Sequence, residues 1–178
     1  MNHHRYLILI SIFLTSIFSS CIQSNERKNN VIIDSLIKAT ENIAIGETKF
    51  GISEKEFNQL HPDSLIILEG NIYTLTSFFN KSKKLNMIYL MDTVTVDNTK
   101  FDKELFNRMD LLKQHFVKTY GEPQQDRGYP KQAKMKNGKA FEAYKWEIGK
   151  KLIAVGIALE ETDEGNIYYV LAHVDRKE

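Results

Sequence analysis

The chain has 178 residues, of which 24 are basic and 23 acidic, so its formal net charge at pH 7 is +1. This charge near zero argues against nucleic acid as a partner, because nucleic-acid-binding domains usually carry a basic excess. Aromatic residues make up 11% of the chain and only 3 residues are proline, which excludes a disordered stalk and predicts a folded domain.

The first 21 residues have the composition of a secretory signal. Residues 1–5 (MNHHR) are basic, residues 6–18 (YLILISIFLTSIF) are almost entirely apolar, and two serines precede Cys21. A basic start, an apolar run of about 7–15 residues and small residues before the cleavage point are typical of such a signal. The apolar run is shorter than the roughly 20 residues that a transmembrane helix needs. We therefore expect a signal peptide at residues 1–20.

The stretch FSSC at residues 18–21 resembles the lipobox of bacterial lipoproteins, in which an apolar residue and two small residues precede a cysteine. The resemblance implies cleavage before Cys21 and acylation of its sulfur, so that Cys21 is the lipid attachment site. The polar residues that follow complete a tether at residues 21–30. Two or more acyl chains hold a protein stably on a membrane. The alternative is an ordinary secretory signal that happens to end in a cysteine.

Residues 31–178 are expected to form a single domain, because a chain of that length matches the usual domain size of about 100–200 residues. The domain begins with VIIDSLIKATENIAIG, in which the apolar positions 32, 33, 36 and 37 fit one face of a helix. We therefore predict a short helix that ends before Gly46.

A second short helix is predicted to begin after residue 53. Ser53 and Glu56 form an S-x-x-E capping box, in which each side chain satisfies a free backbone N–H group at the start of a helix. Phe57 and Leu60 are then expected to point inward, and Pro62 prevents the helix from continuing.

Residues 65–92 change from the helical period to the strand period. Three stretches rich in β-branched and aromatic residues are predicted strands, because Gly70-Asn71 and the polar residues 80–84 separate them. These stretches are LIILE at 65–69, IYTLTSFF at 72–79 and KLNMIYLMD at 84–92. Asp97, Asn98 and Thr99 mark the loop that follows.

A long helix is predicted over residues 101–120. Its apolar residues recur at intervals of three and four, at Phe101, Leu105, Met109, Leu112, Phe116 and Tyr120. Gly121 is expected to end the helix in the left-handed conformation, with Pro123 just beyond it.

The last third of the chain returns to the strand period, with FEAYKWEI at 141–148, LIAVGIALE at 152–160 and IYYVLAHV at 167–174. The stretches 149–151 (GKK) and 161–166 (ETDEGN) mark the turns between them. The chain thus reads helix, three strands, helix, three strands. This order predicts an α+β fold of two helix-plus-three-strand units, in which the strands form one antiparallel sheet with the helices packed on one face.

Two short motifs add a resemblance to known families. Gly51-Ile52-Ser53-x-x-x-Phe57 is similar to the helix start of small outer-membrane assembly lipoproteins of the SmpA/OmlA type, and Tyr120-Gly121-x-Pro123 is similar to their helix end. The tandem helix-plus-sheet pattern also resembles the β-lactamase-inhibitor-protein-like fold. These resemblances imply a lipid-anchored module that works by binding other proteins.

The sequence predicts no catalytic site, metal site or cofactor, so we expect a protein that is not an enzyme. His61, His115 and His173 lack the spacing of metal ligands, and the chain has no G-x-S-x-G motif and no phosphate-binding loop. A hydrolase would need carboxylates or histidines that converge only in the fold. The acidic turn at 160–166 offers carboxylates to a divalent cation, but a solvated hairpin is the favoured interpretation.

A basic loop is the one local feature that indicates a contact surface. Residues 127–139 (RGYPKQAKMKNGK) contain no acid. Each basic residue near an anionic membrane surface contributes about 1 kcal/mol, and a tyrosine is a common anchor in protein interfaces. A solvated loop without a partner is the alternative. The candidate contacts to a partner or to an anionic surface are Arg127, Tyr129, Lys131, Lys134, Lys136 and Lys139.

The expected role is a non-catalytic binding or assembly module, held in the bacterial cell envelope by acyl chains on Cys21 and bound to an envelope protein. We expect it on the periplasmic or surface side, with the outer membrane favoured over the inner. The alternative is an envelope ligand-binding or carrier protein with an apolar pocket between helices and sheet. The aromatic residues available to line such a pocket are Phe57, Tyr73, Phe78, Tyr144 and Trp146.

Overall fold

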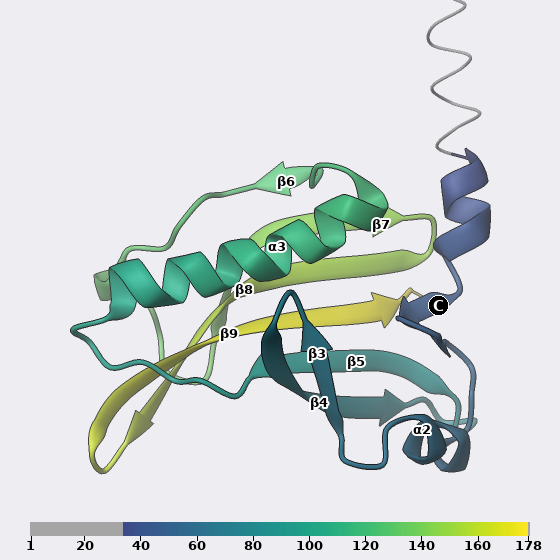
Figure 1. The fold of residues 1–178 in the computed structure, drawn as a ribbon, viewed down its shortest axis with the longest axis horizontal. Helices are drawn as coiled ribbons and strands as arrows, with labels where there is room; N and C mark the ends of the chain where they lie inside the picture. Colours follow the sequence, from purple (N-terminus) through teal and green to yellow (C-terminus); the bar gives the residue numbers. More distant parts are fainter. Residues whose placement is uncertain (1–33, 178) are drawn as a thin grey trace, which may run out of the picture. The chain divides into compact units, whose positions relative to one another are not determined.

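The computed structural model describes residues 34–177 of the chain. The predicted signal peptide, Cys21 and the tether lie outside these residues. The chain divides into two units, residues 1–39 and residues 40–178. The described part of the first unit is helical, and the second unit contains the sheet and the helices that follow (Figure 1). No helix among the described residues is long and apolar enough to cross a membrane.

The first predicted helix is shorter than expected. Residues 34–40 are helical, but Ile43–Ile45 forms strand β1, which pairs with strand β2 (Thr48–Lys49) in an antiparallel two-stranded sheet. The prediction of one helix up to Gly46 is therefore wrong. Gly46 has a φ of 53°, which allows the tight turn between the two strands.

Helix α2 (Glu54–Leu60) begins where its capping box predicts. The hydroxyl of Ser53 accepts the N–H of Glu56 at 3.3 Å, and the carboxylate of Glu56 accepts the N–H of Ser53 at 2.7 Å. Phe57 is buried as predicted, whereas Leu60 is 49% exposed, so its predicted inward orientation is wrong. Helix α2 has only about two turns and buries one residue, Phe57, whose ring centroid lies 6.3 Å from that of Phe79.

The main sheet has seven strands in the order β3-β4-β5-β9-β8-β7-β6, and every neighbouring pair is antiparallel. This arrangement confirms the predicted α+β class and the antiparallel sheet. The two groups of strands meet where β5 pairs with β9. The strands are β3 (Leu65–Leu68), β4 (Asn71–Phe79), β5 (Leu85–Asp92), β6 (Gln125–Asp126), β7 (Ala140–Ile148), β8 (Lys151–Thr162) and β9 (Gly165–Arg176).

The long predicted helix is present, but its first turn is a π-helix. Phe101–Leu105 is π-helical, and helix α3 (Phe106–Tyr120) continues from it. Gly121 ends the helix with φ 74° and ψ −166°, a conformation open to glycine but different from the left-handed one we predicted. The carbonyl oxygen of Gly121 accepts the indole N–H of Trp146 at 2.8 Å, which ties the helix end to β7.

The hydrophobic core lies between α3 and one face of the sheet. Helix α3 runs across β7, β8 and β9 (Figure 1). All but one of the predicted inward residues of this helical region are buried, the exception being the half-buried Tyr120. The opposing sheet residues are at most 5% exposed: Tyr144, Trp146, Ile148, Ile153, Val155, Ile157, Leu159, Tyr168, Val170, Ala172 and Val174.

Two charged side chains, those of Asp92 and Lys151, are buried beside the core. The guanidinium of Arg108 on α3 donates two hydrogen bonds, of 2.5 and 2.6 Å, to the carboxylate of Asp92 on β5. Lys151 was predicted to lie in a turn, but it begins β8 and is fully buried, so that prediction is wrong. The amine is held there because it donates to the carbonyl oxygens of Thr40 and Ile43 and to the hydroxyl of Tyr120.

Candidate functional site

The face of the main sheet opposite α3, here called the open face, carries most of the large apolar side chains that are exposed in the described part of the chain. Strand geometry produces it, because successive side chains of a strand point to opposite sides. On β4, Tyr73 and Leu75 point into the core, so Thr74, Thr76 and Phe78 point to the open face. The register places Met91, Tyr89 and Met87 of β5 opposite these three residues, and therefore on the same face.

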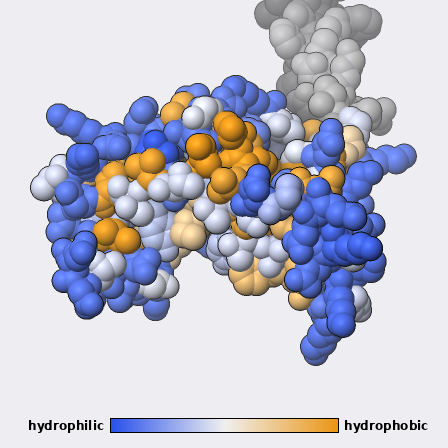
Figure 2. All heavy atoms as spheres, turned by 60° about the horizontal axis from the view of Figure 1, so that its bottom comes forward, coloured by the Kyte–Doolittle hydropathy of each residue, from blue (hydrophilic) through white to orange (hydrophobic). Residues whose placement is uncertain are grey.

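Among residues 34–177, five of the seven large hydrophobic residues that are exposed lie on the open face. They are Leu65, Ile67, Ile72, Phe78 and Met91, and the other two are Leu60 and Tyr129. Figure 2 shows hydrophobic side chains gathered in the middle of one side of the molecule, with hydrophilic side chains around them. A contiguous exposed apolar patch marks an interaction site in soluble proteins, whereas single exposed apolar residues do not.

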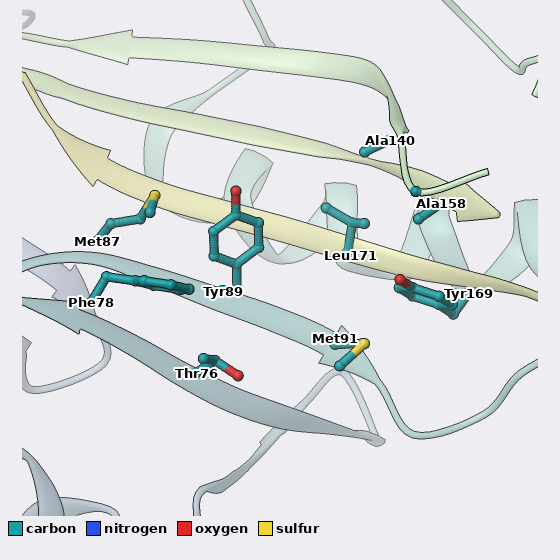
Figure 3. Close-up of a pocket in the computed structure, with 10 residues that line it drawn as sticks. Thr76, Phe78, Met87, Tyr89, Met91, Ala140, Ala158, Tyr169 and Leu171 are labelled. Carbon is teal, nitrogen blue, oxygen red and sulfur yellow. The ribbon is translucent and has the colours of Figure 1, made fainter. Parts of the chain in front are cut away.

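A groove of about 450 Å³ lies in the open face. One wall is formed by large side chains of β4, β5 and β9, and the opposite side by small residues of β7 and β8 (Figure 3). The difference in side-chain size makes the hollow. The lining residues are Thr76, Phe78, Met87, Tyr89, Met91, Gly138, Ala140, Ala158, Tyr169 and Leu171.

Gly156 fixes the close approach of β7 to β8 beside the groove. A Cβ atom at this position would lie 2.0 Å from the carbonyl oxygen of Phe141. Only glycine allows this contact, because backbone atoms of the neighbouring strand occupy the space of a side chain. The register shift between Glu142 and Tyr144 on β7 lies opposite this position.

The groove is lined by uncharged groups. Phe78 contacts Tyr89 edge to face, with ring centroids 5.3 Å apart, and Tyr89 also packs against His173 at 5.7 Å. Burial and the nearby carboxylate of Glu160 raise the pKa of Tyr169, so its phenol is neutral at pH 7. Met87 and Met91 add flexible thioether side chains, which adapt to the shape of what they contact. Such a lining binds by burying apolar surface.

The structure divides the predicted basic loop into two parts. Lys134, Lys136 and Lys139 are exposed and surround a hollow of about 160 Å³ together with Met135, Ala140 and Phe141. Ala140 lines this hollow and the groove, so the three lysines border one end of the groove. Lys131 is exposed and does not line either hollow.

Arg127 and Tyr129 are fixed against the body of the protein. The N–H of Arg127 donates to the carbonyl of Ala143, and its guanidinium lies 4.7 Å from the ring centroid of Phe141. Tyr129 stacks on Phe106, with ring centroids 4.3 Å apart, and leaves 48% of its surface exposed. The predicted anchor tyrosine is thus already packed on one side.

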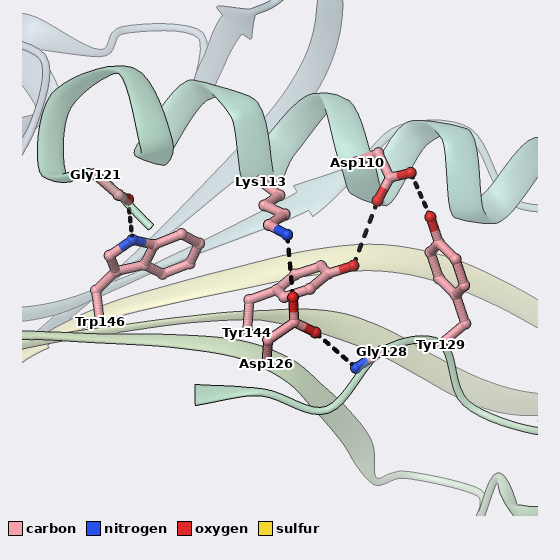
Figure 4. A network of polar contacts seen from close by, with 8 residues as sticks. All are labelled: Asp110, Lys113, Gly121, Asp126, Gly128, Tyr129, Tyr144 and Trp146. Atoms are coloured by element: carbon pink, nitrogen blue, oxygen red, sulfur yellow. Dashed lines mark hydrogen bonds and ion pairs between the residues drawn. The ribbon is translucent and has the colours of Figure 1, made fainter. Parts of the chain in front are cut away.

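A polar network holds this part of the loop on α3 (Figure 4). The carboxylate of Asp110 accepts the hydroxyl of Tyr129 at 2.5 Å and that of Tyr144 at 3.4 Å. The hydrogen bond to Asp110 raises the pKa of Tyr129 to about 12, and burial raises that of Tyr144. Lys113 donates to Asp126 at 3.2 Å. These contacts give the network a structural role, which is to position the loop beside the sheet.

The aromatic residues predicted to line a pocket are mostly in the core. Phe57, Tyr73, Tyr144 and Trp146 are at most 3% exposed, and of the five only Phe78 lines the groove. Tyr144 also lines a second hollow, of about 480 Å³, whose other walls include charged side chains of α3 and β6. Sequence reasoning missed Met87, Tyr89, Met91 and Tyr169. The available signal was that β5 and β9 carry large apolar residues on both faces, whereas residues 31–178 have one long predicted helix, at 101–120, which can cover only one of the two faces.

The three histidines considered as metal ligands each have a different neighbour, and the acidic turn forms a hairpin. His61 contacts Thr48, His115 lies near Glu69, and His173 lies near Asp175. Strands β8 and β9 meet at a two-residue turn, Asp163-Glu164, within the predicted acidic stretch. Among residues 34–177, no group of three or more histidine, cysteine, aspartate or glutamate side chains is placed to hold a metal ion.

Comparison with known proteins adds no assignment: no family model matches the chain, and neither the curated proteins nor the solved structures gave a match.

Proposed function

We propose that the protein is a membrane-anchored lipoprotein that acts as a non-catalytic binding or assembly module in the bacterial cell envelope. The FSSC stretch supports the anchor at Cys21. The observation that carries the binding role is the open face, with its groove of about 450 Å³ and its exposed apolar residues. Removal of apolar surface from water is the main driving force of protein association, and this face offers such surface in one place.

The charge beside the groove indicates the chemistry of the partner. Lys134, Lys136 and Lys139 border one end of it and are exposed. A partner with a central apolar segment and acidic residues at one side would match both features, since complementary charge guides association and fixes its register. We therefore propose an envelope protein with an apolar, acid-flanked surface.

We also interpret the domain as two helix-plus-three-strand units. Helix α2 precedes β3, β4 and β5, and helix α3 precedes β7, β8 and β9. The pairing of β5 with β9 joins the two groups into one sheet. In this interpretation the two helix-plus-three-strand units build the open face together, and the groove lies across the junction between their strands.

Crosslinking at the groove tests the binding role. A photoreactive amino acid replaces Phe78, which is 43% exposed on the groove, and the crosslinked products are identified from membranes by mass spectrometry. One stoichiometric envelope protein is expected. Met91→Lys places a charge in the groove and should reduce its yield about tenfold or more, since a lysine charge cannot be buried unpaired. Leu60→Lys is the matched control, because Leu60 is exposed but lies on α2.

The specific observation that favours the alternative, a ligand-binding or carrier protein, is the size of the groove. Small-molecule pockets usually measure about 300–1,000 Å³, and this groove falls in that range. Methyl NMR on methionine separates the two roles. Met87 and Met91 report on the groove, and the buried Met109 serves as an internal control. Saturable shifts of Met87 and Met91 with dodecanoate, without a crosslinked protein, would support the carrier role over the assembly role.

A further inference from the structure

The outer edge of β3 has unpaired backbone groups, and their positions follow from the register. The N–H of Leu75 donates to the carbonyl of Ser64 at 2.8 Å. Hydrogen-bonded and non-hydrogen-bonded pairs alternate along an antiparallel ladder, so the backbone of Ile66 also faces β4. The N–H and C=O groups of Leu65 and Ile67 therefore point away from the sheet, where β3 is the terminal strand.

Nothing in β3 protects this edge. Proteins usually protect a terminal strand with a lysine, a proline, a bulge or a very short length. Strand β3 reads LIIL, and its pairing with β4 has no register shift. Ile67 is 69% exposed and Leu65 is 46% exposed. The opposite edge, β6, differs because it is two residues long and contains Asp126, with Gly128 and Pro130 soon after it.

We propose that the β3 edge binds an extended, apolar segment of another protein, which pairs with Leu65 and Ile67 as an additional antiparallel or parallel strand and carries basic residues beside its apolar positions. The unpaired backbone groups require an extended occupant, because only a strand presents donors and acceptors at matching intervals. The inference rests on the proposed function in one respect, namely that the partner is a protein.

The charges at the two ends of β3 favour basic flanks on that segment. Asp63 is exposed before β3 and makes no ion pair with another described residue, and Glu69 follows it. The same charges argue against a second copy. Antiparallel pairing of Leu65 with Ile67 of another copy would set Asp63 opposite Glu69, and like charges directly opposite each other destabilise a strand pair. Lys118 pairs with Glu69 and offsets part of its charge, so Asp63 carries the larger share of this preference.

Amide hydrogen exchange measured by NMR on the full-length protein in detergent micelles tests this edge. The probe is a synthetic peptide of alternating valine and threonine with a lysine at each end. It is expected to slow exchange at the amides of Leu65 and Ile67. Ile66 is the internal control, because its amide already faces β4. A peptide that is N-methylated at every residue should have no effect, because neither of its edges then offers an N–H group, and one with glutamate ends should bind more weakly at low salt.

Ile67→Lys is the matched variant, since the side chain is exposed and a lysine protects an edge without disturbing the fold. It should weaken peptide binding about tenfold. Unchanged exchange at millimolar peptide would overturn the proposal. Slow exchange without peptide that depends on protein concentration, with a dimer mass in light scattering, would overturn it in favour of a second copy. A protein crosslinked through position 78, together with unchanged amide exchange at Leu65 and Ile67, would support the proposed function and show that this inference is wrong.

Discussion

Lys151 is a fully buried lysine whose amine donates three hydrogen bonds. Burial lowers its pKa from 10.5 to about 8, because the charged ammonium loses its hydration. The bonds to Thr40 and Ile43 tie the start of the second unit to β8, and the bond to Tyr120 ties the end of α3 to the same point. One side chain thus links three segments that are distant in the sequence.

The lowered pKa of Lys151 predicts how stability depends on pH. Between about pH 8 and pH 10.5 the unfolded chain keeps the proton on this amine while the folded protein has released it. The unfolded state then binds more protons, so the free energy of unfolding rises with pH over this window. At 1.36 kcal/mol per pH unit the gain approaches about 3 kcal/mol. Below pH 8 both states are protonated and the contribution is constant.

Lys151→Met should remove this gain. The measurement is urea unfolding of wild type and variant across that pH window, with the difference between their unfolding free energies plotted against pH. The difference should rise with pH for Lys151→Met and stay flat for Lys150→Met, which replaces the exposed neighbouring lysine. Parallel pH profiles for wild type and Lys151→Met would show that the buried amine does not titrate in this range.

At the scale of elements, the basic loop is the segment that joins the polar network on α3 to the groove. Asp110 and Phe106 hold Tyr129 at one end of the loop, and Ala140 is shared by the lysine hollow and the groove at the other end. Because its first part is packed on α3, the loop presents its lysines from a defined position.

We predict that replacing Lys134, Lys136 and Lys139 by serine reduces the yield of the protein crosslinked through Phe78. The physical reason is lost attraction to acidic residues of the partner, so the effect should be largest at low salt, where charges are least screened. The control is a second triple variant in which Lys81, Lys83 and Lys84 are replaced by serine, since these lysines are exposed in the turn between β4 and β5. Equal yields from both triple variants at low salt would contradict the prediction.

The sequence predicted the elements well where a local signal determines them. The capping box places the start of α2, and the spacing of three and four along residues 101–120 identifies the inner face of α3. Both signals are read within one turn or one helix. The longer strands β4, β5, β7, β8 and β9, and the short β3, also follow from local composition, and the hairpins from Gly70, Gly149 and Gly165, which all have positive φ.

The failures at Lys151 and at the groove depend on contacts between distant residues. Lys151 looks like a turn residue until Thr40, Ile43 and Tyr120 surround its amine. The groove was missed for the same reason. Met87, Tyr89 and Met91 alternate with core residues on β5, and nothing in that strand tells which of its two faces a helix covers. The strand order and the path of α3 decide it, and both arise from the fold of the whole chain.

At the scale of the whole molecule, the proposed anchor determines where the open face works. Residues 21–30 are the predicted tether, and an extended chain spans at most about 3.3–3.6 Å per residue. A tether of that length keeps the domain within a few nanometres of the membrane that holds Cys21. A partner in the same membrane is then met at high effective concentration, so a modest affinity of the groove suffices for stable assembly.

Cys21→Ala should therefore abolish membrane attachment and reduce crosslinking through Phe78 together. Acyl chains on Cys21 supply about 0.8 kcal/mol per buried methylene, and alanine offers no sulfur to carry them. Membrane fractionation and labelling with radioactive palmitate measure the attachment. Ser20→Ala is the control, because it changes a neighbouring small residue and leaves the thiol in place. Attachment that survives Cys21→Ala would mean that the protein is held by something other than this cysteine. Lost attachment with undiminished crosslinking would place the partner in the soluble space of the envelope and remove the need for a shared membrane.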